Sequence, residues 1–131
     1  MKRDLNLFRT ILFEIEKKSA GEDWILNRDS SNLYTNDSEE KNILEHLILM
    51  QDARLITKAV SKGSDDFYEL YPCNLTNEGH DFLDAVRNSS VWEKIKATVL
   101  DKGISCSIEA ITILAKKLAK EHLAELFNIT L

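Results

Sequence analysis

The sequence predicts an α+β fold that is mostly helical, and two observations carry this prediction. Apolar residues recur at helical spacing through most of the chain, whereas only the stretches 55–61 and 67–75 are rich in residue types that favour strands. The chain has 131 residues and a hydrophobic content of 44%, which is enough to bury a core. We therefore expect one cooperative unit.

The first predicted element is a helix that begins after Asp4, a residue able to cap it, and ends near Lys17 and Lys18. Its apolar residues recur three and four positions apart and should face the core; they are Leu5, Phe8, Ile11, Leu12 and Ile15. The polar segment 21–37 follows. It contains a short apolar run, 24–26, which we interpret as a brief strand in a long connection.

A second helix is predicted over 38–52, where Asp37 with Glu40 three residues later forms a typical capping arrangement. Residues 47–50 are all apolar, and at about 100° per residue they point to every side of the helix. At least one of them must leave the main core face. That residue needs a second covering surface, either the C-terminal helices or a partner.

Two strands come next, over 55–61 and 67–75, and residues 62–66 form the turn between them. Pro72 marks the end of the second strand or its open edge. Helix, strand, helix and two-stranded hairpin is the element order of a winged helix, although the usual middle helix is missing or very short here. The predicted fold is therefore an abbreviated winged helix-turn-helix with a two-stranded wing.

The remaining residues predict a helical C-terminal extension. Thr76 can cap one helix, and Ser90 with Glu93 resembles a capping box for the next. A last helix over about 107–127 has a wide apolar stripe that must pack on the domain or on another copy. We expect a winged-helix-like domain over 1–88 and an extension over 89–131 packed on it.

Three segments resemble one known family. The opening MKRDLNLFRTILFEIE, the segment EHLILMQDARLI and the later LTNEGHDFLDAVRN followed by Trp92 are similar to the bacterial and phage family catalogued as domain of unknown function 2513. The resemblance implies a small cytoplasmic protein, often carried by phages or prophages, with a winged-helix fold and no agreed activity. Two positions depart from the family pattern: Asn77 replaces an aromatic residue, and Arg54 replaces a glycine before Leu55.

Composition restricts the function classes. The net charge is −5 at pH 7, so no overall basic field attracts a polyanion, and nucleic acid would have to bind a local patch. No stretch is apolar enough for a signal peptide core or a membrane span, and the two cysteines, Cys73 and Cys106, fit reduced thiols in a cytoplasm. We find no phosphate loop, dinucleotide fingerprint or metal-ligand motif. We therefore expect no cofactor, no metal and no enzymatic activity.

DNA association is slightly favoured as the function, because the helix over 38–52 would occupy the recognition position of a winged helix. Five residues could contact DNA: Lys41, Asn42 and His46 on that helix, and Lys58 and Lys62 around the wing. Carboxylates on the same helix and at the tip of the wing oppose these positive charges. A solvated polar face explains the same pattern, so this alternative stays open.

The alternative function is a protein-interaction module that modulates a host or phage complex. Its surface would comprise the acidic Glu45 and the surplus apolar residues Ile48 and Leu49 of the second helix. The apolar stripe of the last helix could also form a homodimer, through residues that include Ile111, Leu118 and His122. The basic residues of that helix, Lys116, Lys117 and Lys120, are interpreted as an ordinary solubilising face.

Overall fold

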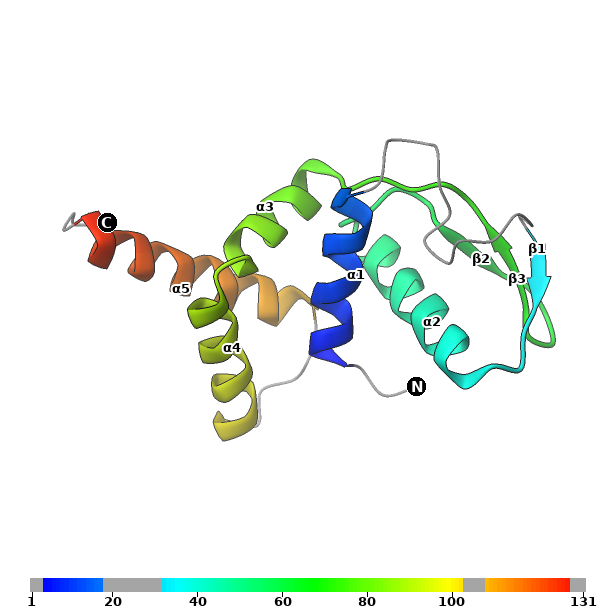
Figure 1. Ribbon diagram of the computed structural model, residues 1–131, viewed down its shortest axis with the longest axis horizontal. Helices are drawn as coiled ribbons and strands as arrows, with labels where there is room; N and C mark the ends of the chain where they lie inside the picture. The colour runs from blue at the N-terminus through cyan, green and yellow to red at the C-terminus, as the bar shows by residue number, and fades with distance from the viewer. Residues whose placement is uncertain (1–3, 18–31, 103–107, 128–131) are drawn as a thin grey trace. The chain divides into compact units, whose positions relative to one another are not determined.

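The computed structural model describes residues 4–17, 32–102 and 108–127. These residues form five helices and three strands, so the prediction of a mostly helical α+β fold is confirmed (Figure 1). The chain divides into two compact units, Met1–Gly79 and His80–Leu131, whereas the sequence predicts a boundary after residue 88. The strand predicted at 24–26 and the second cysteine, Cys106, lie outside the described residues.

Two helices form the α-helical part of the first unit. Helix α1 spans Leu5–Lys17 and α2 spans Ser38–Asp52, and the two helices contact each other. Both predicted caps are confirmed, because Asp4 Oδ1 accepts the Leu7 N–H at 3.1 Å and Asp37 Oδ1 accepts the Glu40 N–H at 3.0 Å. The predicted core residues of α1 are buried except Leu5, which is half-buried.

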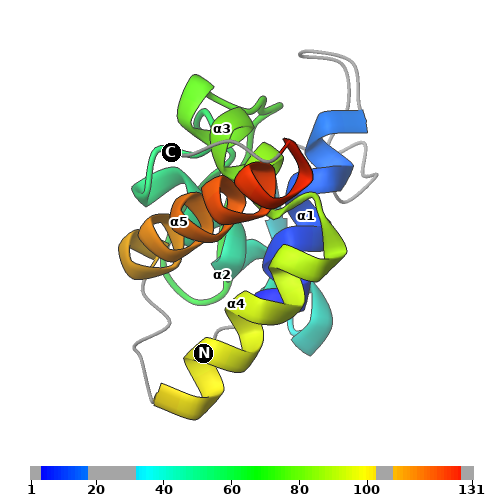
Figure 2. The ribbon, with the colours of Figure 1, turned by 90° about the vertical axis from the view of Figure 1, so that its left-hand side faces the viewer.

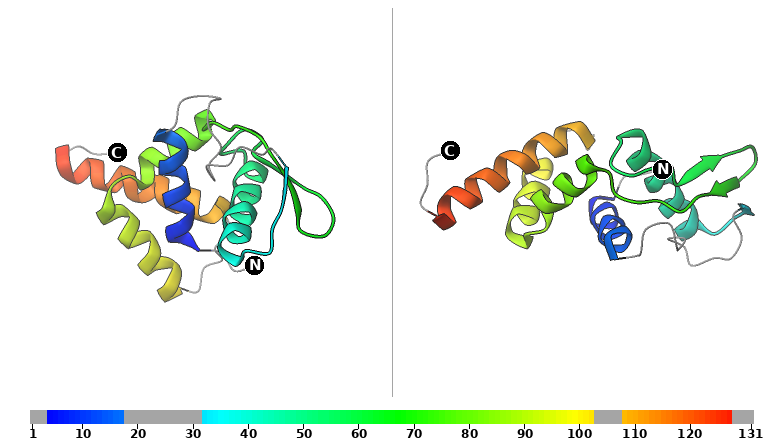
Figure 3. Two further views of the ribbon diagram at one scale, coloured as in Figure 1. Left: turned by 45° about the vertical axis from the view of Figure 1, so that its right-hand side comes forward. Right: turned by 90° about the horizontal axis from the view of Figure 1, so that it is seen from above.

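A three-stranded antiparallel sheet completes this unit. Strands β1 (Asn32–Tyr34), β2 (Val60–Lys62) and β3 (Phe67–Leu70) lie in the order β1-β3-β2. The right-hand view of Figure 3 shows β2 and β3 as a hairpin. Both hairpin strands are shorter than predicted. Beyond β3 the two segments stay paired only at intervals, as in the bridge between Ile56 and Leu75.

The side chain of Gln51 supplies hydrogen-bond partners for the backbone at the start of β2. Its Oε1 accepts the N–H groups of Ala59 at 2.9 Å and Val60 at 3.1 Å, and its Nε2 donates to the Val60 carbonyl at 2.6 Å. Ala59 and Val60 are buried, so these backbone groups depend on Gln51 for partners. One side chain of α2 therefore replaces a neighbouring strand at the start of β2.

The connection after α2 has the left-handed residue that the family pattern implies. Arg54 has φ of 64°, a conformation that glycine adopts more easily. The Arg54 N–H donates to the Gln51 carbonyl and the Leu55 N–H donates to the Met50 carbonyl, both at 3.0 Å, which is the Schellman pattern of a helix end. Helix α2 thus ends at the expected place although Arg54 replaces the glycine.

Helix α3 (Asn77–Val86) begins against this connection. The Thr76 hydroxyl donates to the Arg54 carbonyl at 2.6 Å and accepts the Gly79 N–H at 3.0 Å, which confirms Thr76 as the predicted cap. Gly79 is buried, and a Cβ atom there would overlap the Leu55 carbonyl group. The first turn of α3 can therefore approach the Leu55 backbone only because residue 79 has no side chain.

The second unit contains the helices α4 (Ser89–Lys102) and α5 (Ile108–Phe127), which pack against each other (Figure 2). The cap of α4 differs from the prediction, because Asn88 Oδ1 accepts the N–H groups of Ser90 and Val91 at 2.8 and 3.2 Å. Asn88 takes this role instead of Ser90 because the helix begins two residues earlier than predicted. No helix among the described residues is long and apolar enough to cross a membrane.

We expect Gly79→Ala to destabilise the protein by about 1–3 kcal/mol, because the added methyl group must displace backbone and not a flexible side chain. Urea unfolding followed by circular dichroism measures the change. Asp81→Ala, at an exposed position of the same helix, is the matched control and should have little effect. Equal stability of Gly79→Ala and wild type would show that α3 does not approach Leu55 this closely.

A second prediction concerns Gln51→Met, which keeps a side chain of similar length but removes all three hydrogen bonds to β2. We expect a loss of about 1–3 kcal/mol in the free energy of unfolding, because buried backbone groups lose their partners. Hydrogen exchange should also accelerate at Ala59 and Val60. Asp52→Ala, at the exposed neighbouring position, serves as the control. If Asp52→Ala lowered the free energy of unfolding as much as Gln51→Met does, this role of Gln51 would be contradicted.

Candidate functional site

An open groove of about 560 Å³ lies between α2 and the β2–β3 hairpin, within the first unit. It brings together Lys41, Asn42 and Lys62, which were predicted to contact DNA, and Glu45, which was predicted to contact a protein. The other lining residues are Ser38, Glu39, Asp66 and Tyr68. Four of the predicted site residues therefore share one surface that joins α2 and the hairpin.

Two ion pairs cross from α2 to the hairpin. Lys62 Nζ lies 2.6 Å from Glu45 Oε1, and Lys41 Nζ lies 2.6 Å from Asp66 Oδ1. The Tyr68 hydroxyl also donates to Glu45 Oε1 at 3.3 Å. Each groove lysine thus has a carboxylate partner on the opposite element.

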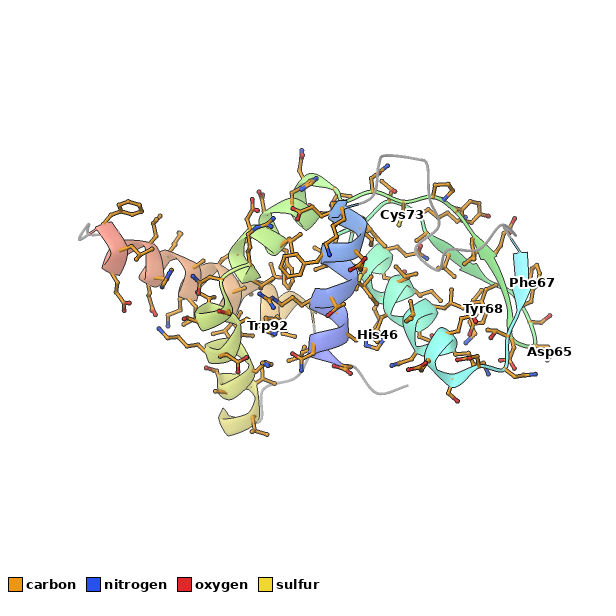
Figure 4. All side chains as sticks on the ribbon, in the orientation of Figure 1. His46, Asp65, Phe67, Tyr68, Cys73 and Trp92 are labelled. Atoms are coloured by element: carbon orange, nitrogen blue, oxygen red, sulfur yellow. The ribbon has the colours of Figure 1, made fainter. Side chains whose placement is uncertain are left out.

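The turn of the hairpin places Asp66 for its ion pair. Asp65 and Asp66 have φ of 52° and 61°, left-handed values that aspartate tolerates better than most residues. The Asp66 carbonyl accepts the Thr35 N–H at 3.1 Å, which joins the turn to the residue after β1. Figure 4 shows Asp65 at the tip of this hairpin, with Tyr68 on β3 nearer to α2.

Proton affinities in the groove follow these contacts. The hydrogen bond from Lys62 is the main cause that lowers the pKa of Glu45 below its ordinary value of 4.5. The same hydrogen bond raises the pKa of Lys62, and burial raises the pKa of the Tyr68 phenol. Glu45 and Lys62 therefore stay charged, and Tyr68 stays protonated, across the physiological range.

The charge of the groove does not favour a phosphate ligand. Three carboxylates, on Glu39, Glu45 and Asp66, outnumber the two ammonium groups of Lys41 and Lys62. Phosphate binding requires lysines or arginines that exchange their counterions for the phosphate. Here that exchange would first have to break an ion pair within the protein.

His46 is a correction to the predicted DNA-contacting residues. Its side chain is only 1% exposed, and it lies between α1 and α2 (Figure 4). Nε2 accepts the Asp4 backbone N–H at 3.0 Å, and Nδ1 lies 2.7 Å from the Asn42 carbonyl oxygen. The imidazole therefore joins the start of α1 to α2 and has no surface to offer DNA. The expectation of an exposed histidine was wrong because the start of α1 lies against this side of α2.

The remaining DNA candidates differ in position. Lys58 is exposed, but it lies outside the groove, with its Nζ 4.9 Å from the centre of the Tyr71 ring. Asn42 is half-buried at the groove wall. The structure thus leaves Lys58 as an exposed cation without a carboxylate partner among the described residues, whereas Lys41 and Lys62 are paired.

The predicted protein-binding residues are only partly accessible. Ile48 and Leu49 are half-buried on α2 and do not line the groove. Ile111 is 4% exposed, so it cannot form a dimer contact as expected. Leu118 and His122 are half-buried, and His122 Nε2 lies 3.2 Å from Asn88 Nδ2. Of the three residues predicted for a dimer, only Ile111 is therefore buried.

Sequence reasoning missed the apolar residues that are exposed. Among the described residues these are Leu100 on α4, and Ile113, Leu123 and Phe127 on α5. Leu126, which the sequence placed in the apolar stripe of the last helix, is exposed as well. Their signal was present in the helical spacing of α5, where Ile113 lies opposite the buried Ile111 and Ala115. No group of three or more His, Cys, Asp or Glu residues in the described part of the chain could hold a metal ion.

Comparison with known proteins identifies the family. The family model described as "Hypothetical protein (DUF2513)" matches residues 2–105. The chain belongs to the DUF2513 family. A relative from Haemophilus influenzae, named "Uncharacterized protein", is 33% identical over 124 residues, covering 95% of this chain and all of the relative. No solved structure matches this DUF2513 protein.

The ion pair of Glu45 predicts a pH dependence. A carboxylate whose pKa is lowered in the folded state contributes stability above its ordinary value of 4.5, and this contribution is lost as the pH falls through the folded pKa. We expect Glu45→Gln to lower the free energy of unfolding by about 0.2–1 kcal/mol at neutral pH, and to have little effect near pH 3.

Urea unfolding at both pH values tests this expectation. Glu14→Gln is the matched control, because Glu14 forms an exposed pair with Lys17 at 3.4 Å within α1. The difference between wild type and Glu45→Gln should shrink in acid. A difference that stays constant down to about pH 3 would mean that the Glu45 carboxylate does not stabilise the hairpin by its charge.

Proposed function

We propose that the unit Met1–Gly79 is a winged-helix-like, non-enzymatic binding module whose groove between α2 and the hairpin docks a protein. The observation that carries this proposal is the pair of internal ion pairs, Lys41 with Asp66 and Lys62 with Glu45. They neutralise the two groove lysines that phosphate would need. They also hold helix and hairpin at a fixed separation, which favours docking of a shaped surface.

The order of the elements supports the winged-helix part of the proposal. Helix α1, strand β1, helix α2 and the β2–β3 hairpin follow one another, and the sheet has the order β1-β3-β2. In winged helices the helix before the hairpin is the recognition element. Because one fold supports several kinds of ligand, the choice between them depends on the chemistry of the groove.

That chemistry fits a polar protein segment better than a polyanion. The groove offers paired charges and the Tyr68 ring, and its Glu39 carboxylate is exposed. A partner segment with a basic or hydrogen-bond-donating side chain would complement Glu39 and would leave both ion pairs intact. We propose a host or phage protein of the cytoplasm as the partner, in keeping with the family resemblance.

DNA binding is the second candidate, favoured by the position of α2 before the hairpin and by the exposed Lys58. Lys41 and Lys62 would have to leave their carboxylates to reach phosphates. Association would then be weak and steeply salt-dependent. Regulation of transcription belongs with this second candidate.

A duplex titration and site-specific crosslinking together test the proposed function. In fluorescence anisotropy with a random DNA duplex at about 50 mM salt, we expect no binding by the wild type. The variant Glu45→Gln with Asp66→Asn releases both lysines and should bind the duplex measurably. Tight wild-type binding that weakens steeply with salt would favour the DNA candidate instead.

For the docking itself, a photo-crosslinking amino acid replaces Asn42 in the groove or, as control, the exposed Lys94 on α4. We expect position 42, and not position 94, to give a discrete protein adduct in cells. The adduct should diminish when Glu39→Lys is added. Equal labelling from both positions, or nucleic-acid adducts at position 42, would contradict a protein-docking groove.

A further inference from the structure

Helix α5 has two seams with the same spacing. The inner seam contains Ile111 and Ala115, which are buried, and Leu118 and His122, which are half-buried. The outer seam follows the positions 113, 116, 120, 123 and 127, which alternate three and four residues apart and so share one face. All five outer side chains are exposed; Ile113 and Phe127 are each 65% exposed.

The outer seam is basic as well as apolar. Lys116 and Lys120 occupy its middle, and the exposed Lys117 lies next to them. None of these three lysines forms an ion pair with another residue in the described part of the chain. Two outer seams facing each other would bring their lysines together. A symmetric pair of α5 helices is therefore disfavoured, and an acidic counter-surface is required.

Helix α2 presents such a surface. Its positions 38, 41, 45, 48 and 52 have the same three-and-four spacing and are exposed or half-buried. Within this seam Lys41 and Glu45 already form ion pairs with the hairpin, so among the described residues its unpaired negative charge comes from the exposed Asp52. Ile48, with the half-buried Leu49 beside it, adds apolar area. The exposed Glu39 and Asp65 add carboxylates near its first half and on the hairpin. The first half of this seam, Ser38, Lys41 and Glu45, lines the groove.

We propose that the outer seam of α5 docks on the α2 seam of a second copy of the chain. An antiparallel arrangement sets Lys120 opposite Glu45 and Lys116 beside Ile48 and Asp52, whereas a parallel arrangement would set Lys116 against Lys41. The contact joins two different surfaces of each copy, so it either closes reciprocally into a dimer or ring or continues as an open assembly. This inference rests on the proposed function, because it names one occupant of the α2 surface.

Sedimentation velocity of the full chain over a roughly hundredfold range of concentration is the first experiment. We expect the average mass to rise with concentration above that of the monomer. We also expect the association constant to fall roughly tenfold between about 50 mM and about 500 mM salt, because opposite charges attract across the contact. A monomer mass that stays constant over the whole range would overturn the proposal.

Charge reversal identifies the two surfaces. Variant A carries Lys116→Glu, Lys117→Glu and Lys120→Glu on α5, and variant B carries Glu39→Lys and Asp52→Lys on α2. Each variant alone should remain monomeric, since its two seams then have the same sign of charge. An equimolar mixture should associate again, because the reversed α5 of A meets the reversed α2 of B. Circular dichroism and thermal unfolding establish that both variants are folded.

Three further outcomes distinguish this contact from a membrane contact and from docking of a different protein. If variant B alone associates like the wild type, α2 is not the counter-surface and the inference fails. If the wild type is monomeric but binds vesicles of anionic lipid through its α5 lysines, the outer seam belongs to a membrane contact and the inference also fails. A discrete adduct to another protein at position 42, without self-association, would leave the proposed function standing and remove only this inference.

Discussion

The three hydrogen bonds of Gln51 hold the first unit in its arrangement. They fix the last turn of α2 to the backbone of β2, and so they set where the hairpin begins and which way it faces. The ion pairs of Lys41 and Lys62 join the same two elements, α2 and the hairpin, nearer the tip of the hairpin. Buried backbone N–H and C=O groups must have hydrogen-bond partners, and Gln51 supplies them at the place where the groove begins.

Local signals in the sequence predicted the helix starts well. Asp4, Asp37 and Thr76 each accept an N–H group three residues ahead, so the whole interaction lies within one short segment. The mostly helical α+β class and the hairpin turn were also predicted from patterns that lie within short segments of the sequence. The predicted N-cap of α4 was wrong by two residues, because Asn88 and Ser90 can both cap a helix and the sequence does not distinguish between them.

Contacts between residues far apart in the sequence could not be predicted from these local signals. His46 is polar and lies on a helix with many charged residues, so its burial depends on the Asp4 backbone far away in the sequence. Gln51 has no motif that marks its role. Four of the predicted site residues line one groove, whereas His46 and Lys58 lie outside it. The sequence also did not indicate which carboxylate each groove lysine would pair with. Burial of Ile111 likewise depends on tertiary packing.

The order of strands in the sheet has a consequence for synthesis on the ribosome. Strand β1 pairs with β3, the last strand in the chain, and makes no ladder with β2. The first strand to emerge therefore has no partner until α2, β2 and the hairpin turn have all left the exit tunnel. The hairpin is local and closes quickly, whereas β1 must wait for it. Completion of the sheet at its β1 edge is then the late event in folding of this unit.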